Sequence, residues 1–338
     1  MNFLKALQSL NSCFGPSGQE KGIARRIQEF CAPYADEVYT DTLGNLIAHK
    51  KGAGAKVMLC AHMDSIGFIV THIEKEGFLR VGAIGGISPG AVAGTPVKFQ
   101  NGVMGVVCLN EEIGDKKPKS DDLYIDIGAK DEDEAKTLVD IGDAAVYASP
   151  TFRAGEAIIS PYLDNRISCV ALLMVLESIK HSENDLYFVF STQEEVGIRG
   201  AQTAAFRLEP DYAVAVDVTI SDDVPGSKHS ASCKAGGGAA VKVMDASVIC
   251  HPELVKELES LAKREDIPYQ LDVITAGGTD AGAIHKSRGG VVTGGVSVPC
   301  RYTHTPAELV WESDVAACVR LLTAFCEEKL EPVGAEKR

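Results

Sequence analysis

Two adjacent carboxylates, Glu194 and Glu195, follow a short run of apolar and aromatic residues at 185–190. Because this run is nearly continuous rather than alternating, it predicts a strand that is buried on both faces. In open α/β sheets, ligands bind beyond the carboxyl ends of the strands, where this pair would lie. Neighbouring strand residues point to opposite faces, so one glutamate can hold a metal ion while the other faces substrate. Taken alone, the pair is better explained as solvated surface charge.

Further potential metal ligands stand where other apolar runs stop or where a helix begins. They are His62, Asp164, Asp217 and His304. Histidine nitrogen combined with carboxylate oxygen suits Zn²⁺, Co²⁺ or Mn²⁺ better than an all-thiolate site does. The ligands are too many for one four-coordinate ion that also keeps a water, so two ions sharing a bridging carboxylate fit better. Each residue has a structural explanation of its own, such as a helix N-cap for Asp164, but their joint occurrence favours a metal site.

Asp64 lies two residues beyond His62, so on a strand the two side chains would share a face. Its carboxylate can then accept the second ring N–H of the histidine, which is the usual support of a metal-binding histidine. We therefore expect Asp64 to orient His62. Cys60 lies close by, but its place within an apolar strand favours packing over a role as a nucleophile.

Alternating helices and strands must position these side chains. Apolar residues at helical spacing predict helices over residues 2–13, 18–30, 164–181, 252–266 and 312–330. Buried runs predict strands over residues 41–48, 56–61, 185–190, 212–216, 269–274 and 291–298. The alternation indicates an α/β fold with a central sheet. A chain of 338 residues is longer than one core usually holds, so we expect two domains.

The segment 68–160 differs from the rest of the chain, because its predicted strands are short and glycine and proline are frequent. Asn101-Gly102 between two apolar runs is a strong hairpin signal. Only one helix, near residues 131–139, is expected there. We interpret the segment as a small β-barrel domain inserted into a catalytic α/β domain that is formed by residues 1–67 and 161–338.

The composition excludes some classes of partner. A net charge of −14 argues against nucleic acid and anionic membranes, because both bind basic patches. The ten cysteines include no Cys-x-x-Cys pair, and several lie in apolar runs, which is typical of reduced thiols in a cytoplasmic protein. We recognise neither a signal peptide nor an apolar run of membrane-spanning length.

Six short motifs occur in order along nearly the whole chain. They are Ala61-His62-Met63-Asp64-Ser65-Ile66-Gly67, Leu163-Asp164-Asn165-Arg166, Thr192-Gln193-Glu194-Glu195-Val196-Gly197, Asp217-Val218-Thr219, Gly278-Thr279-Asp280-Ala281 and Arg301-Tyr302-Thr303-His304-Thr305-Pro306. Together they resemble the tetrahedral (TET) metallo-aminopeptidases, metallopeptidase family forty-two. The set is specific to that family, whereas any single motif is not.

The resemblance implies a phosphorylase/hydrolase-like α/β domain with a central mixed sheet and two divalent metal ions, with Zn or Co expected and Mn possible. By matching positions, it implies the following roles: Asp164 bridges the ions, His62 and Asp217 complete one site, Glu195 and His304 complete the other, Glu194 is the general base, and Asp64 orients His62. It also implies a cis peptide bond after Asp164. The inserted barrel would be a dimerisation domain, and the dimers would form a hollow tetrahedral dodecamer that admits short peptides.

Two alternatives to an aminopeptidase remain open. A related two-metal amidohydrolase or deacylase would act on a non-peptide amide, and a non-catalytic oligomeric scaffold would keep only the fold. Some members of the family are labelled endoglucanases, which we discount because the expected site is a metal site rather than a metal-free pair of carboxylates. No motif marks the substrate-binding residues. A basic pocket residue such as Arg301 or Lys234 would favour acidic N-termini.

Overall fold

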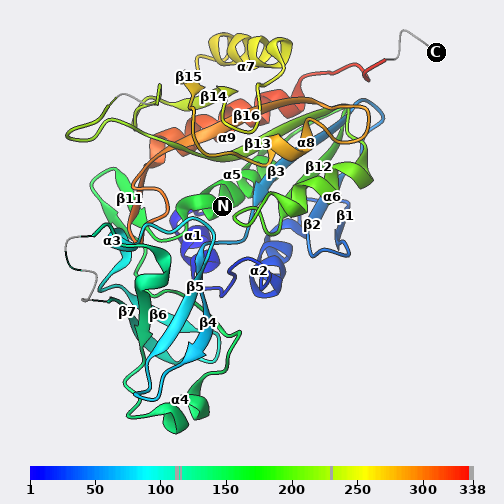
Figure 1. Ribbon diagram of the computed structural model, residues 1–338. Coiled ribbons are helices and arrows are strands. Elements are labelled where there is room, and N and C mark those ends of the chain that lie inside the picture. The colour runs from blue at the N-terminus through cyan, green and yellow to red at the C-terminus, as the bar shows by residue number, and fades with distance from the viewer. Residues whose placement is uncertain (111–113, 115, 229–230, 335–338) are drawn as a thin grey trace.

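The computed structural model describes residues 1–110, 114, 116–228 and 231–334. Within these residues the chain forms one 11-stranded mixed sheet and one closed barrel of antiparallel strands. Figure 1 shows the barrel lying below the large sheet and its helices. The expected fold, an α/β body with a central mixed sheet and a small inserted β-barrel, is therefore confirmed.

The large sheet is parallel at its centre, and its outer pairs are antiparallel except for β14 with β15. β3 pairs in parallel with β12 on one side and with β13 on the other, and β13 pairs in parallel with β16. The strands of the sheet are β1 (Glu37–Thr40), β2 (Leu46–Lys50), β12 (Asp185–Ser191), β3 (Lys56–His62), β13 (Tyr212–Ile220), β16 (Val292–Arg301), β17 (Glu308–Trp311), β11 (Ala157–Ser160), β10 (Phe152–Ala154), β14 (Ala239–Met244) and β15 (Tyr269–Val273).

Helices cover both faces of this sheet because its central strands are apolar on both sides. In β3, Val57 and Leu59 pack into the larger core, while Met58 and Cys60 point into a smaller core on the opposite face. The larger core holds helices α1 (Phe3–Asn11), α2 (Lys21–Cys31), α5 (Leu163–Ser178), α7 (Pro252–Arg264) and α9 (Glu312–Glu327). The smaller core holds α6 (Arg199–Leu208) and α8 (Ala281–Ile284). The nearly continuous apolar runs of the sequence correspond to these doubly covered strands.

The barrel is built from short strands with its own hydrophobic core. Its strands, in spatial order, are β4 (Gly67–Ile73), β5 (Leu79–Ile84), β8 (Leu123–Asp126), β7 (Met104–Leu109), β6 (Pro96–Phe99) and β9 (Ala144–Tyr147). The predicted hairpin at Asn101-Gly102 is confirmed, because β6 pairs with β7 through Lys98 and Met104. β10 and β11, which follow the barrel in the chain, pair within the large sheet instead.

Several elements differ from the expectations. Among its described residues, the barrel segment carries two helices rather than one, because α3 (Pro89–Val92) precedes the expected α4 (Glu132–Leu138), and it also has a 3-10 turn, η2 (Ser120–Asp122). α6 was not predicted because its buried side is mostly alanine and glycine, which give little hydrophobic signal. Among the described residues, no helix combines the length and the apolarity that crossing a membrane requires.

Candidate metal centre

The parallel pairing at the centre of the sheet brings the strand-end residues together. His62 ends β3 and lies opposite Ser191, the last residue of β12, so the loop that carries Glu194 and Glu195 begins beside it. β13 lies on the other side of β3 and carries Asp217. Because parallel strands end at the same edge, residues that are far apart in sequence converge at this edge.

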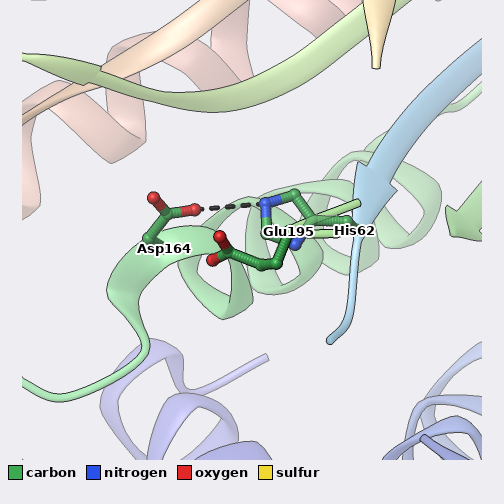
Figure 2. Close-up of side chains that lie close together, drawn as sticks. All are labelled: His62, Asp164 and Glu195. Atoms are coloured by element: carbon green, nitrogen blue, oxygen red, sulfur yellow. Dashed lines mark hydrogen bonds and ion pairs between the residues drawn. The ribbon is translucent and has the colours of Figure 1, made fainter. Parts of the chain in front are cut away.

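Asp164 lies between the two histidines. Its Oδ1 is 3.1 Å from His62 Nε2, and its Oδ2 is 3.2 Å from His304 Nε2. Figure 2 shows Asp164 pointing at the His62 ring, with Glu195 beside both. His62, Asp164 and Glu195 each offer a ligand atom, and these three atoms lie within 4.8 Å of one another. A carboxylate whose two oxygens face different imidazoles is arranged to contact two cations at once.

The remaining candidates surround this group. Asp217 Oδ1 is 3.7 Å and Glu194 Oε2 is 3.8 Å from His62 Nε2, while Glu195 Oε2 is 3.4 Å from His304 Nε2. Asp64 lies behind His62, and its Oδ1 is 3.4 Å from the Nδ1 atom of the ring. The structure therefore brings together all seven residues that the sequence singled out, and it leaves none of them elsewhere.

Asp64 also fixes the two glutamates. It is fully buried and accepts hydrogen bonds from the backbone N–H groups of Glu194 at 3.0 Å and Glu195 at 3.3 Å. The hydroxyl of Ser17 donates to the same carboxylate at 2.7 Å. One carboxylate thus lies beside the ring of His62 and also holds the start of the glutamate loop through two backbone N–H groups.

Glu308 is a further residue of the site that the sequence-based predictions did not include. It is 2% exposed, and its carboxylate accepts the backbone N–H groups of Asp164 at 2.9 Å and His304 at 2.8 Å. His304 has a φ of 63°, a left-handed conformation that is strained for a residue other than glycine. Glu308 lies four residues beyond His304, at the start of a short strand, and no pattern in the sequence around it marks it as part of the site.

Other contacts fix the orientation of the ligands. The Nδ1 atom of His304 lies 2.7 Å from the carbonyl oxygen of Gly86, so a proton on Nδ1 leaves Nε2 with a free lone pair toward Asp164. The peptide bond between Asp164 and Asn165 is cis, as the resemblance implied. Glu20, a second residue that was missed, is 6% exposed and accepts the N–H of Gln193 at 3.1 Å.

Burial and mutual repulsion dominate the electrostatics of the site. Burial raises the pKa of Glu194 and that of Asp217 well above their usual ranges, and neighbouring carboxylates raise both further. Burial and the nearby Asp164 raise the pKa of Glu195 to about 8. Burial lowers the pKa of His304, but its hydrogen bond with Asp164 and the surrounding carboxylates outweigh this effect and raise it to about 11. Crowded buried carboxylates of this kind require compensating positive charge.

This donor set fits divalent cations. One oxygen of Glu195, Oε1, is buried and has no hydrogen-bond partner among the described residues. The cavity at the site is lined by Asp164, Glu194, Glu195 and Asp217, and its described lining contains no lysine or arginine. Four carboxylates from buried and partly buried residues, accompanied by two imidazoles, form an oxygen and nitrogen site of the kind that Zn²⁺, Co²⁺ or Mn²⁺ occupies.

Comparisons with known proteins agree with this geometry. A family model described as M42 glutamyl aminopeptidase matches residues 44–321. The lysyl aminopeptidase of Pyrococcus furiosus is 37% identical over 94% of this chain and 95% of its own. An aminopeptidase structure from the archaeon Desulfurococcus kamchatkensis superposes with a TM-score of 0.93, at 36% identity over 98% of this chain and 95% of its own. The TET1 peptidase of Pyrococcus horikoshii is described as assembling into a tetrahedron or a large octahedral shell. Its structure superposes with a TM-score of 0.87, at 31% identity over 97% of this chain and 100% of its own.

Proposed function

The chain belongs to the M42 peptidase family and is a peptide hydrolase, and from this premise we propose that it is a two-metal aminopeptidase that releases N-terminal residues from short peptides. One observation carries the proposal: Asp164 presents one oxygen to His62 at 3.1 Å and the other to His304 at 3.2 Å. A single carboxylate shared between two histidine-containing ligand groups is the arrangement of a dinuclear centre.

In this proposal Asp164 would be shared by two divalent ions, Zn or Co, with Mn also suited to the donors. His62 and Asp217 would hold one ion, while Glu195 and His304 would hold the other. When bound, the ions would polarise the scissile carbonyl and lower the pKa of the attacking water. The close approach of His62 to Asp217 and of Glu195 to His304 supports this division of the ligands.

Glu194 is the proposed general base. It lies on the loop after β12 beside the ligands, and burial raises the pKa of its carboxyl well above its usual range. A carboxylate with a raised proton affinity takes a proton from the attacking water and then delivers it to the leaving amine. Asp64 acts as a positioning residue, since it contacts His62 and accepts the backbone N–H of Glu194.

The barrel has an assembly role in this proposal. Residues 1–67 and 161–338 form the catalytic domain, and the barrel within 68–160 forms an inserted dimerisation domain, while β10 and β11 at the end of that segment join the large sheet. The dimers assemble further into a tetrahedral dodecamer, a proposal supported by the assembly described for the TET1 peptidase. The net charge of −14 opposes nucleic-acid and membrane partners, and the ten free cysteines support a cytoplasmic location.

The proposal is tested by hydrolysis of aminoacyl anilides with a free amine by the full-length protein. The protein is stripped with a chelator and then refilled with Zn²⁺, Co²⁺ or Mn²⁺, and bound metal is counted per chain by mass spectrometry. Activity that is lost on stripping and restored with two ions per chain is expected. Hydrolysis restricted to N-acylated substrates would indicate the deacylase instead, and no hydrolysis with metal bound would indicate a scaffold.

A further inference from the structure

A cavity of about 630 Å³ extends from the proposed metal ligands between three loops. Apart from the ligands and Glu194, its wall is made mostly of small and aliphatic residues. The aliphatic ones are Ile87, Ile198, Val218, Ile220 and Ile274. We propose that this wall binds the N-terminal side chain of the peptide and makes the enzyme select uncharged aliphatic residues there. The inference rests on the proposed aminopeptidase function and adds its substrate class.

Two hydroxyl groups of the wall, those of Thr219 and Thr279, are already committed to other partners. The Thr219 hydroxyl donates to Asp272 at 3.0 Å, and the Thr279 hydroxyl donates to Asp245 at 3.1 Å. Neither proton is therefore available to a carboxylate on the substrate. An acidic side chain in this cavity would lose its hydration without gaining a donor from either threonine, which is unfavourable.

The basic residues near this region are also neutralised or lie outside the cavity. Arg301 donates to both carboxylate oxygens of Asp223, at 2.9 and 2.6 Å, and its guanidinium lies 4.8 Å from the centre of the Trp311 ring. Neither Arg301 nor Lys234 is among the lining residues. The sequence-based suggestion that one of them supplies positive charge for acidic N-termini finds no support in this geometry.

A basic N-terminal side chain is disfavoured for a related reason. The carboxylates that line the cavity are Asp164, Glu194, Glu195 and Asp217, all of them assigned to the metal ions or to proton transfer. None of the described lining residues offers a further carboxylate at the aliphatic wall. A lysine or arginine placed against this wall would be desolvated without a dedicated partner.

The wall is held in one shape. The N–H of Ala246 donates to the carbonyl of Gly277 at 3.0 Å, which anchors the loop that ends at Thr279. A Cβ on Gly278 would lie 3.0 Å from Ser247, so this loop packs tightly against its support. Ile198 has a φ of 56°, an unfavourable conformation for a β-branched residue that the surrounding fold maintains. A preformed apolar cavity selects side chains by size and polarity without the cost of ordering a loop.

The test measures kcat/KM of the metal-loaded, full-length enzyme on leucyl, alanyl, glutamyl and lysyl anilides. The kcat/KM for the leucyl substrate is expected to exceed that for the alanyl substrate by about tenfold or more, because a few additional methylene groups buried in an apolar pocket strengthen binding by about this factor. Glutamyl and lysyl substrates are expected to fall below leucyl by at least that factor. A wild-type preference for glutamyl or lysyl substrate would overturn this inference and leave the aminopeptidase assignment intact. No hydrolysis of any of the four would instead remove the proposed function.

Introducing a charge at the wall provides a second test of the same inference. Ile220 is 42% exposed, so a charged replacement can remain hydrated and the protein should fold. Ile220→Lys should raise the glutamyl-to-leucyl ratio of kcat/KM, and Ile220→Glu should raise the lysyl-to-leucyl ratio, each by about tenfold. Val273, 38% exposed and absent from the lining, is the matched control: Val273→Lys and Val273→Glu should leave both ratios unchanged. Equal shifts from both positions would mean that general surface charge, and not this wall, sets the preference.

Discussion

The carboxylate of Glu308 accepts the backbone N–H of Asp164 at 2.9 Å, across a sequence separation of 144 residues. The same side chain accepts the N–H of His304 at 2.8 Å. Glu308 therefore holds both Asp164, which faces the two histidines, and His304, which is one of them. A misplaced Glu308 would disturb both halves of the proposed dinuclear centre.

Glu308→Ala should weaken both folding and metal binding. Two backbone N–H groups in a buried region would lose their acceptor, which costs about 1–3 kcal/mol of stability for each unpaired group. We expect metal affinity to fall about 10- to 100-fold, as for other residues that support metal ligands. Urea unfolding and calorimetric titration of the stripped protein measure the two effects. Glu312→Ala, at an exposed ion pair with Arg153, is the control and should change neither quantity.

Glu194→Gln should abolish turnover while leaving both metal ions bound. The amide has nearly the shape of the carboxylate but cannot accept the proton of the attacking water, and loss of general-base catalysis costs about 10²–10⁴-fold in kcat. The measurement combines kcat on the preferred anilide with metal counted per chain. A variant that retains wild-type kcat would exclude Glu194 as the base, and one that loses metal would make it a ligand instead.

Gly200→Ala should damage the site from a distance. A Cβ at Gly200 would lie 2.3 Å from Asn45 Oδ1 and 2.5 Å from the backbone nitrogen of Thr192. Thr192 begins the loop that carries Glu194, so relief of the clash must move that loop or α6. We expect a stability loss of about 1–3 kcal/mol and a kcat/KM lowered by about tenfold or more. Gly289→Ala, which would meet no atom within 4 Å, should behave like the wild type.

Lys242→Met should be strongly destabilising. Lys242 Nζ lies 2.6 Å from Asp272 Oδ2, and both side chains are almost completely buried. Removing one partner leaves an uncompensated buried carboxylate, which costs about 3–5 kcal/mol. The double variant Lys242→Met with Asp272→Leu should recover part of this loss in urea unfolding. If Lys242→Met is as stable as the wild type, Lys242 does not stabilise the protein by neutralising the buried carboxylate of Asp272.

The contribution of the Arg301–Asp223 pair to stability should depend on pH. The hydrogen bond from Arg301 lowers the pKa of Asp223 to about 2, below the value of about 3.9 of an unfolded aspartate. The stabilisation is therefore complete above about pH 4 and is lost as the pH falls through about 2. The Tm difference between wild type and Asp223→Asn should accordingly be smaller at pH 3 than at pH 6. Salt should reduce the difference at pH 6, because the pair is partly exposed. A difference that grows toward low pH would contradict the assignment of the shift.

The sequence determined the central strands of the large sheet, the points at which they stop and the residues at those points, whereas outer strands such as β14 and β17 were not predicted. The run at 185–190 is apolar on both faces, and this pattern alone requires layers on both sides of the sheet. Because β3, β12 and β13 are parallel neighbours, residues placed just beyond their ends must meet at one edge. His62 and the glutamate pair could be grouped on this basis without coordinates.

Only the tertiary structure decided which distant groups hold those residues and what surrounds them. Glu308, Glu20 and the cavity wall lie in segments with no local pattern to mark them. Each matters through a partner far along the chain, as with Glu308 and Asp164. Local patterns arise from neighbours a few residues apart, which the sequence displays directly. Contacts such as these arise from how complete elements pack, and that packing is a property of the whole chain.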